Sequence, residues 1–234
     1  MVDVSRPLLS WRHLLAAVLV LGALDLILIG LFVGHALAVK HGWQTPIRSP
    51  YFNINRDGGL AEWFEYAKSA TAALTLIGCS RAKASQAFLA LAGLHVWIAA
   101  DNSLRLHEQV GGMLGEALIG GDVAGLIPAS DAGQVVFHAL VLATASTFLW
   151  LTARRETRFL WPTYGVLFLA AISPGFFGVL VDAFHASSLS AGIGRGVLIL
   201  VEDGGETIML SIACALSIAC WIEVREQQVA AEAA

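Results

Sequence analysis

Six long apolar stretches alternate with shorter polar segments along the chain, and each stretch is long enough to cross a lipid bilayer. They cover residues 14–38, 60–80, 86–107, 134–152, 159–182 and 196–222. A membrane-spanning helix needs about 20 mostly apolar residues, because the hydrocarbon core of a bilayer is about 30 Å thick. The pattern therefore predicts an all-α integral membrane protein, a bundle of six transmembrane helices that forms a single domain over residues 1–234.

The connections between these stretches predict an orientation. Lys and Arg occur two or three at a time in the N-terminal tail and in the second and fourth connections, and the C-terminal tail has Arg225. The third connection has none beyond Arg105 at its edge, and the fifth has only Arg195. The first connection, which is also basic, is the exception. Because positive residues accumulate on the cytoplasmic side, we expect both termini to be cytoplasmic. The stretch at 14–38 is longer than a signal-peptide core and is interpreted as a retained helix.

In this orientation, acidic and histidine residues gather at the extracytoplasmic ends of the predicted helices. The set comprises Glu62, Glu65, Asp101, His107, Glu108, His138, Asp182, His185, Glu202, Asp203 and Glu206. Ionisable side chains within a membrane are costly, so such a cluster is a candidate functional site by default. We expect this site at the periplasmic side of a bacterial inner membrane.

Two short motifs near the fifth and sixth stretches have the spacing of metal ligands. Asp182 and His185 are three residues apart and share one face of a helix, unless they form a hydrogen-bonded pair near the headgroups. Glu202, Asp203 and Glu206 form the run E-D-G-G-E, in which three acids repel one another unless a cation or protons compensate. The alternative is an acidic helix start that complements the helix dipole.

The end of the third stretch allows two interpretations. Asp101, Arg105 and Glu108 share one stripe of a regular helix, which favours a ladder of ion pairs. His107 points about a third of a turn away from Asp101, so a regular helix cannot bring Asp101, His107 and Glu108 to one metal ion. We expect His107 and one of the acids to be ligands, with Arg105 as a candidate anion-binding group.

The remaining candidates are weighed against structural roles. Glu65 is three residues from Lys68, which predicts a local ion pair, whereas Glu62 has no such neighbour. His138 stands alone on an apolar helix, although its level in the membrane matches the cluster. Asp25 lies deeper, where we expect an interhelical hydrogen bond. The glycine-rich connection 109–133 predicts a short interfacial helix, a lid or a mobile loop.

Carboxylates and imidazoles without an available thiolate suit iron, zinc or manganese, bound as one or two ions. The predicted ligands are His107, Glu108, Asp182, His185, Glu202, Glu206 and His138. We expect Asp203 or Glu62 to orient a ligand or to serve as general base. The set does not distinguish a carboxylate-bridged pair of metal ions from a single ion with an open position.

These observations favour a membrane-embedded metalloenzyme, a di-metal oxidoreductase or hydrolase acting on a lipid-phase or periplasmic substrate. A proton or metal-ion transporter is the first alternative, and a non-catalytic metal-binding or assembly subunit of a membrane complex is the second. The composition fits a bilayer environment, with 57% hydrophobic and only 14% charged residues. The net charge of -4 and the absence of a basic run argue against nucleic acid as a partner. The oligomeric state does not follow from the sequence.

Overall fold

The computed structural model describes residues 8–120, 128–181 and 193–233, which contain helices and turns and no strand. The seven α-helices among these residues are α1 (Trp11–His41), α2 (Leu60–Lys83), α3 (Gln86–Leu104), α4 (Leu106–Leu118), α5 (Ala129–Ala153), α6 (Trp161–Gly175) and α8 (Ile193–Ala233). Three short 3-10 helices cover Pro46–Arg48, Pro50–Phe52 and Arg158–Leu160, and the π-helix η4 (Phe176–Val181) continues α6. The all-α prediction is confirmed.

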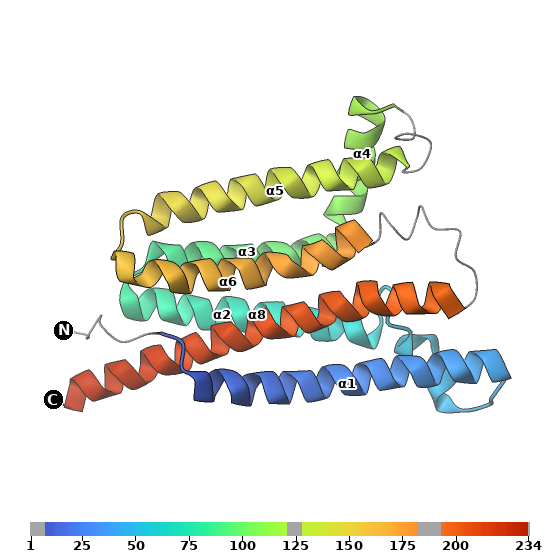
Figure 1. The fold of residues 1–234 in the computed structure, drawn as a ribbon, viewed down its shortest axis with the longest axis horizontal. Coiled ribbons are helices and arrows are strands. Elements are labelled where there is room, and N and C mark those ends of the chain that lie inside the picture. The colour runs from blue at the N-terminus through green and yellow to red at the C-terminus, as the bar shows by residue number, and fades with distance from the viewer. Residues whose placement is uncertain (1–7, 121–127, 182–192, 234) are drawn as a thin grey trace.

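Apart from α4, these helices lie side by side along one axis, and successive ones run in opposite directions (Figure 1). The short helix α4 stands across one end of the bundle, where α3 ends and α5 begins (Figure 1). The start of α1 and the end of α8 both lie at the opposite end. This arrangement brings the ends of α3 and the starts of α2, α5 and α8 together at the end marked by α4.

Five helices among the described residues are long and apolar enough to cross a membrane, which indicates an integral membrane protein. They lie at Trp11–His41, Gln86–Leu104, Ala129–Ala153, Arg158–Gly178 and Val197–Ala233. Helix α2 is not among them, and its first half carries Glu62, Glu65 and Lys68. The count of six spans and the orientation of the termini therefore stay predictions.

The largest apolar core joins α2, α3, α6 and α8 at the end of the bundle away from α4. Leu76, Phe88, Leu167 and Cys220 are buried within it, and the ring of Phe88 meets Tyr164 edge to face with centroids 5.0 Å apart. Such packing holds transmembrane helices together by van der Waals contact, because lipid tails are as apolar as the side chains. The bundle therefore has its largest apolar core at the end away from α4.

A buried ion pair connects α1 to α2 in the interior of the bundle. The Lys68 Nζ donates to Asp25 Oδ1 at 3.0 Å and to the Thr207 backbone oxygen on α8 at 2.8 Å, and the Asp25 and Lys68 side chains are 2% and 1% exposed. The interhelical role predicted for Asp25 is confirmed. The local ion pair predicted between Glu65 and Lys68 is replaced by these contacts, since a buried ammonium group needs partners that surround it.

Candidate metal centre

A cavity of about 1030 Å³ opens at the end of the bundle that α4 crosses. The acidic and histidine residues that the sequence placed at this level and that the structure describes all line it: Glu62, Glu65, Asp101, His107, Glu108, His138, Glu202, Asp203 and Glu206. The D-x-x-H pair, Asp182 and His185, lies outside the described residues. The structure thus gathers at one cavity side chains from five different helices.

The helix predicted to run on to residue 107 is interrupted at Arg105. Helix α3 ends at Leu104, Arg105 has a left-handed backbone (φ 52°), and α4 begins at Leu106. A left-handed conformation costs a non-glycine residue about 1–2 kcal/mol, so surrounding contacts must compensate for it. The expectation of a regular helix, which kept Asp101 and His107 apart, is wrong because the chain turns between them.

The turn brings the Asp101 carboxylate to the start of α4. The backbone N–H of His107 donates to Asp101 Oδ1 at 2.8 Å, and His107 Nδ1 lies 3.3 Å from Asp101 Oδ2. A carboxylate at this place satisfies a backbone donor that has no partner within the helix and complements the helix dipole. Asp101 therefore fixes the position of His107 while its second oxygen faces the imidazole ring.

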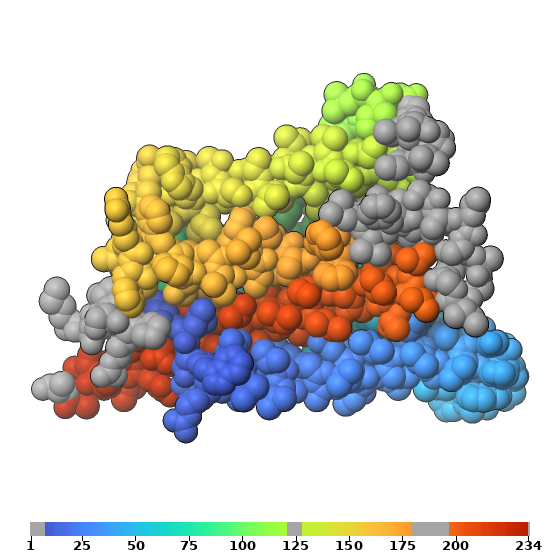
Figure 2. Space-filling view, viewed as in Figure 1, coloured from blue at the N-terminus to red at the C-terminus, as the bar shows by residue number. Residues whose placement is uncertain are grey.

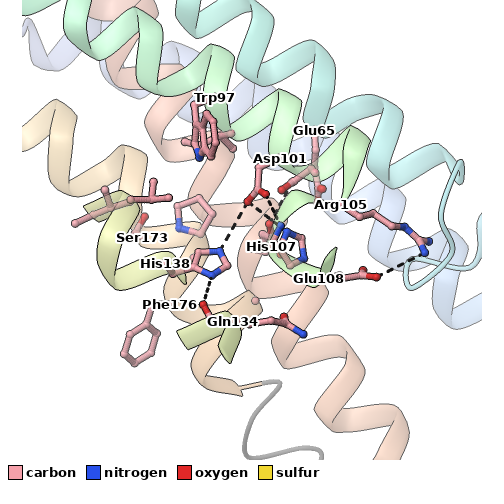
Figure 3. A pocket seen from close by; sticks show the side chains of 18 of the residues that line it. Glu65, Trp97, Asp101, Arg105, His107, Glu108, Gln134, His138, Ser173 and Phe176 are labelled. Carbon is pink, nitrogen blue, oxygen red and sulfur yellow. Dashed lines mark hydrogen bonds and ion pairs between the residues drawn. The ribbon is translucent and has the colours of Figure 1, made fainter. Parts of the chain in front are cut away.

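A second imidazole reaches the same carboxylate from α5. The Nε2 of His138 lies 3.9 Å from Asp101 Oδ2, and the His107 and His138 ring centroids are 5.5 Å apart (Figure 3). His138 Nδ1 donates to the Gln134 backbone oxygen at 2.9 Å, because a carbonyl oxygen only accepts. This bond leaves the lone pair of Nε2 to face Asp101 and His107, as in a metal-binding histidine whose other nitrogen is held by the protein.

The distances among these three side chains fit one metal ion. One donor atom from each of Asp101, His107 and His138 lies within 4.8 Å of the others. Two donors bound to one ion at 2.0–2.2 Å are at most about 4.4 Å apart, and the separations of Asp101 Oδ2 from His107 Nδ1 and His138 Nε2, 3.3 and 3.9 Å, are within that reach. The Asp101 carboxylate is only 8% exposed, and the two imidazoles are 24% and 28% exposed.

Three glycines set the distance between α4 and α5 and hence between the two histidines. A Cβ at Gly133 would lie 1.9 Å from the Gly111 oxygen, and a Cβ at Gly115 would lie 1.9 Å from the Ala129 oxygen. No side chain fits between the two backbones at these positions. The spacing Gly111-x-x-x-Gly115 is a signature of close helix contact that could have been recognised in the sequence. Helix α4 confirms the short helix predicted for the glycine-rich connection 109–133.

Two of the predicted site residues have other partners at the edge of the cavity. Glu108 is 49% exposed and lies 3.7 Å from Arg105, which also pairs with Asp57 in the loop before α2. Glu62 accepts hydrogen bonds from the Gly58 backbone and the Tyr66 hydroxyl. The structure therefore places Glu108 and Glu62 outside the group formed by Asp101, His107 and His138.

The acids of α8 form the wall of the cavity that faces α3 and η4. Glu206 accepts a hydrogen bond from Asn102, the neighbour of Asp101, at 3.4 Å. A Cβ at Gly178 of η4 would lie 2.9 Å from Glu206 Oε2, so this glycine gives the carboxylate its room. Glu202 and Asp203 line the same cavity. On α2, Glu65 accepts from the Thr207 hydroxyl.

A second histidine and carboxylate group lies at the opposite end of the bundle, between α1 and α8. His13 Nε2 lies 3.3 Å from Glu226, and its Nδ1 lies 4.0 Å from Glu223. Glu226 is 60% exposed, and this group lines no part of the cavity. Sequence analysis missed it because its members come from opposite ends of the chain.

The family comparison matches most of the chain. A family described as a domain of unknown function, DUF8692, matches residues 11–220. This range contains every residue of the cavity described above. Comparisons with curated proteins and with solved structures found no match.

Proposed function

Because the chain belongs to the DUF8692 family, whose function is open, we propose a function from the site itself: a membrane-embedded metalloenzyme. Asp101, His107 and His138 bind one divalent metal ion in the wall of the cavity. The observation that carries this proposal is the placement of three donor atoms from three helices within 4.8 Å of one another.

Two histidines and one carboxylate leave coordination positions open for water, dioxygen or substrate. This ligand set is used by zinc hydrolases, in which the ion lowers the pKa of its water, and by non-haem iron oxygenases. Zinc, iron and manganese are the candidate ions. Glu206, which accepts a hydrogen bond from Asn102 of α3, and Asp203 line the same cavity and are our candidates for the general base.

The remaining carboxylates support a second ion. Glu65, Glu202, Asp203 and Glu206 all line the cavity, and a second divalent ion would offset two of their four negative charges. Asp182 and His185 remain proposed ligands on the strength of their spacing. The six-span topology, with the cavity at the periplasmic side, remains part of this proposal.

Elemental analysis of the detergent-purified protein tests the site directly. We expect about one or two equivalents of zinc, iron or manganese per chain, and a loss of metal in Asp101→Asn and His138→Gln. Two matched variants serve as controls. Glu108→Gln removes a carboxylate at the cavity edge that pairs with Arg105, and His13→Gln removes the second histidine group.

The metal content of the variants shows where the ion binds. Full metal in both controls and loss in Asp101→Asn would support the proposed centre. Loss of metal in His13→Gln alone would move the site to the other end of the bundle. A wild-type protein that binds no metal after reconstitution would overturn the proposal of a metalloenzyme.

A proton-coupled transporter is a second candidate, because ionisable groups continue from the cavity into the bundle. Glu65 bonds Thr207, whose backbone oxygen accepts from Lys68, and Lys68 pairs with Asp25. Polar groups along a path across the bilayer are what transport requires. Proton flux into proteoliposomes that disappears in Asp25→Asn would favour this candidate over the enzyme.

A further inference from the structure

The cavity continues from its polar end into an apolar groove between α3, α5 and α6. The groove is lined by Trp97 and Ile98 of α3, Leu142 and Ala145 of α5, and Leu169 and Ile172 of α6. All three helices are among those apolar enough to span a membrane. The same cavity therefore joins a candidate metal centre to a surface of the kind that faces lipid tails.

This groove is open toward the side of the bundle. Leu142, Leu169 and Trp97 are 41%, 64% and 37% exposed although they line the cavity. Helix α5 packs chiefly on α4 and α3, whereas α6 packs chiefly on α8. Figure 2 shows dark green atoms deeper in the molecule between the yellow α5 and the orange α6. A molecule in the bilayer can thus reach the cavity without passing through water.

The length of the groove suits an extended hydrocarbon chain. Its lining on α5 runs from Gln134, beside the metal centre, to Ala145, about 16 Å at 1.5 Å per residue. The polar residues stand at one end of this distance and the apolar residues at the other. The occupant that matches both ends is a single-chain amphiphile with its head group at Asp101, His107 and His138.

The charge of the cavity restricts the head group. Among the described lining residues, eight carboxylates face two arginines, Arg56 and Arg105. Two divalent ions and the two arginines would supply six positive charges against eight carboxylates, so negative charge would still be in excess. An anionic head would meet like charges in a partly dehydrated site, where repulsion is strong.

We propose that the substrate is a long-chain lipid with an uncharged or cationic head group, such as an alcohol or an amine, which enters sideways between α5 and α6. This inference rests on the proposed metalloenzyme function and adds the class of its substrate. Fatty acids and lipid phosphates are excluded as the preferred occupants by the carboxylates of the cavity.

The test uses the full chain in phosphatidylcholine nanodiscs with a photoactivatable hexadecylamine that carries a diazirine near its chain end. We expect crosslinks on the groove residues of α3, α5 and α6. Hexadecanol and hexadecylamine should compete for the crosslink, and hexadecanoate and hexadecyl phosphate should compete at least about tenfold less well. Equal competition by either anion, or crosslinks scattered over the lipid-facing surface, would overturn the proposal.

Two matched substitutions on α5 sharpen the test. Ala145→Phe fills the groove, whereas Ala143→Phe adds the same bulk on an exposed residue that does not line the cavity. We expect crosslinking to fall about tenfold in Ala145→Phe only, since exclusion of two methylene groups accounts for that factor. An unchanged crosslinking yield in Ala145→Phe would contradict binding of the lipid chain in the groove.

Metal content measured in the same samples separates this inference from the proposed function. Normal metal with no groove crosslinks would leave the metal centre standing and reject the lipid substrate. Groove crosslinks with no metal would retain the lipid site and reject the metalloenzyme.

Discussion

At the scale of single residues, Asp101 has two tasks that depend on its two oxygens. One oxygen accepts the backbone N–H of His107, and the other faces the imidazoles of His107 and His138. Arg105, with its left-handed backbone, permits this by turning the chain between Asp101 and His107. The site thus depends on one turn residue that binds no metal itself.

The buried ion pair at the same scale leads to a prediction about stability. Replacing Lys68 by Met leaves the Asp25 carboxylate without its ammonium partner in the interior of the bundle. Removing one member of a buried pair costs about 3–5 kcal/mol, because the remaining charge is poorly solvated. We expect a correspondingly lower free energy of unfolding for Lys68→Met, measured by denaturant titration in detergent micelles.

The double variant provides the control for this prediction. Asp25→Leu combined with Lys68→Met removes both charges, and we expect it to recover most of the lost stability. A double variant as unstable as Lys68→Met alone would mean that the loss comes from packing rather than from an unpaired charge.

At the scale of helices, the contact between α4 and α5 determines whether the two histidines meet. Gly111, Gly115 and Gly133 allow the backbones to touch, and neither histidine is among the atoms that a Cβ at these glycines would meet. The π-helix η4 has a comparable role beside Glu206, where Gly178 makes room for the carboxylate. Close approach of helices, set by small residues, therefore shapes the cavity.

This contact predicts that a methyl group at Gly133 weakens metal binding without touching a ligand. The added Cβ would lie 1.9 Å from the Gly111 oxygen, so α5 must move away from α4 and carry His138 with it. We expect the metal affinity of Gly133→Ala to fall by about 10–100-fold, as when the supports of metal ligands are removed. A competition titration with a zinc chelator measures it.

Gly112→Ala is the matched control for that experiment. Gly112 lies on α4 next to Gly111, on the other side of the same helix contact, but a Cβ there would have no atom within 4 Å. We expect its metal affinity to equal that of the wild type. A metal affinity of Gly133→Ala equal to that of the wild type would show that the glycine contact does not position the histidines.

At the scale of the whole molecule, the polar cavity lies at one end of the bundle and the apolar core at the other. The chain crosses between these ends with successive helices in opposite directions (Figure 1). The end that α4 crosses holds the site, and the last residues of α8 lie at the far end. The side of the membrane that each end faces is a property of the whole chain.

The predicted orientation can be measured by labelling single cysteines in intact cells. Gln109→Cys is exposed on α4 at the cavity end, and Ala230→Cys is exposed at the end of α8. We expect a membrane-impermeant maleimide to label Gln109→Cys from outside and Ala230→Cys only after lysis. The parent chain, whose native cysteines are all buried, gives the background.

The opposite labelling pattern would place the cavity at the cytoplasmic side. It would contradict the distribution of Lys and Arg as a guide to orientation. The arrangement of the helices and the candidate metal centre would be unaffected, since neither depends on which side the cavity faces.

The sequence by itself determined which segments form helices and at which end the ionisable residues gather. Both follow from local information, because a run of apolar residues and the cost of a charge in lipid can be recognised along the chain. This information alone places His107, His138 and Glu206 at one level of the bundle. The role of Asp25 between helices follows from the same reasoning, since a lone carboxylate within an apolar helix needs a partner.

The tertiary structure alone decided which of these residues meet. A turn at Arg105 and a glycine contact between α4 and α5 bring Asp101, His107 and His138 together. Other partners hold Glu62 and Glu108 away from that group, although their position in the sequence is equally suitable. The physical reason is that one backbone angle and distances of a few ångströms between helices set ligand geometry, and neither is encoded in the spacing of residues along a regular helix.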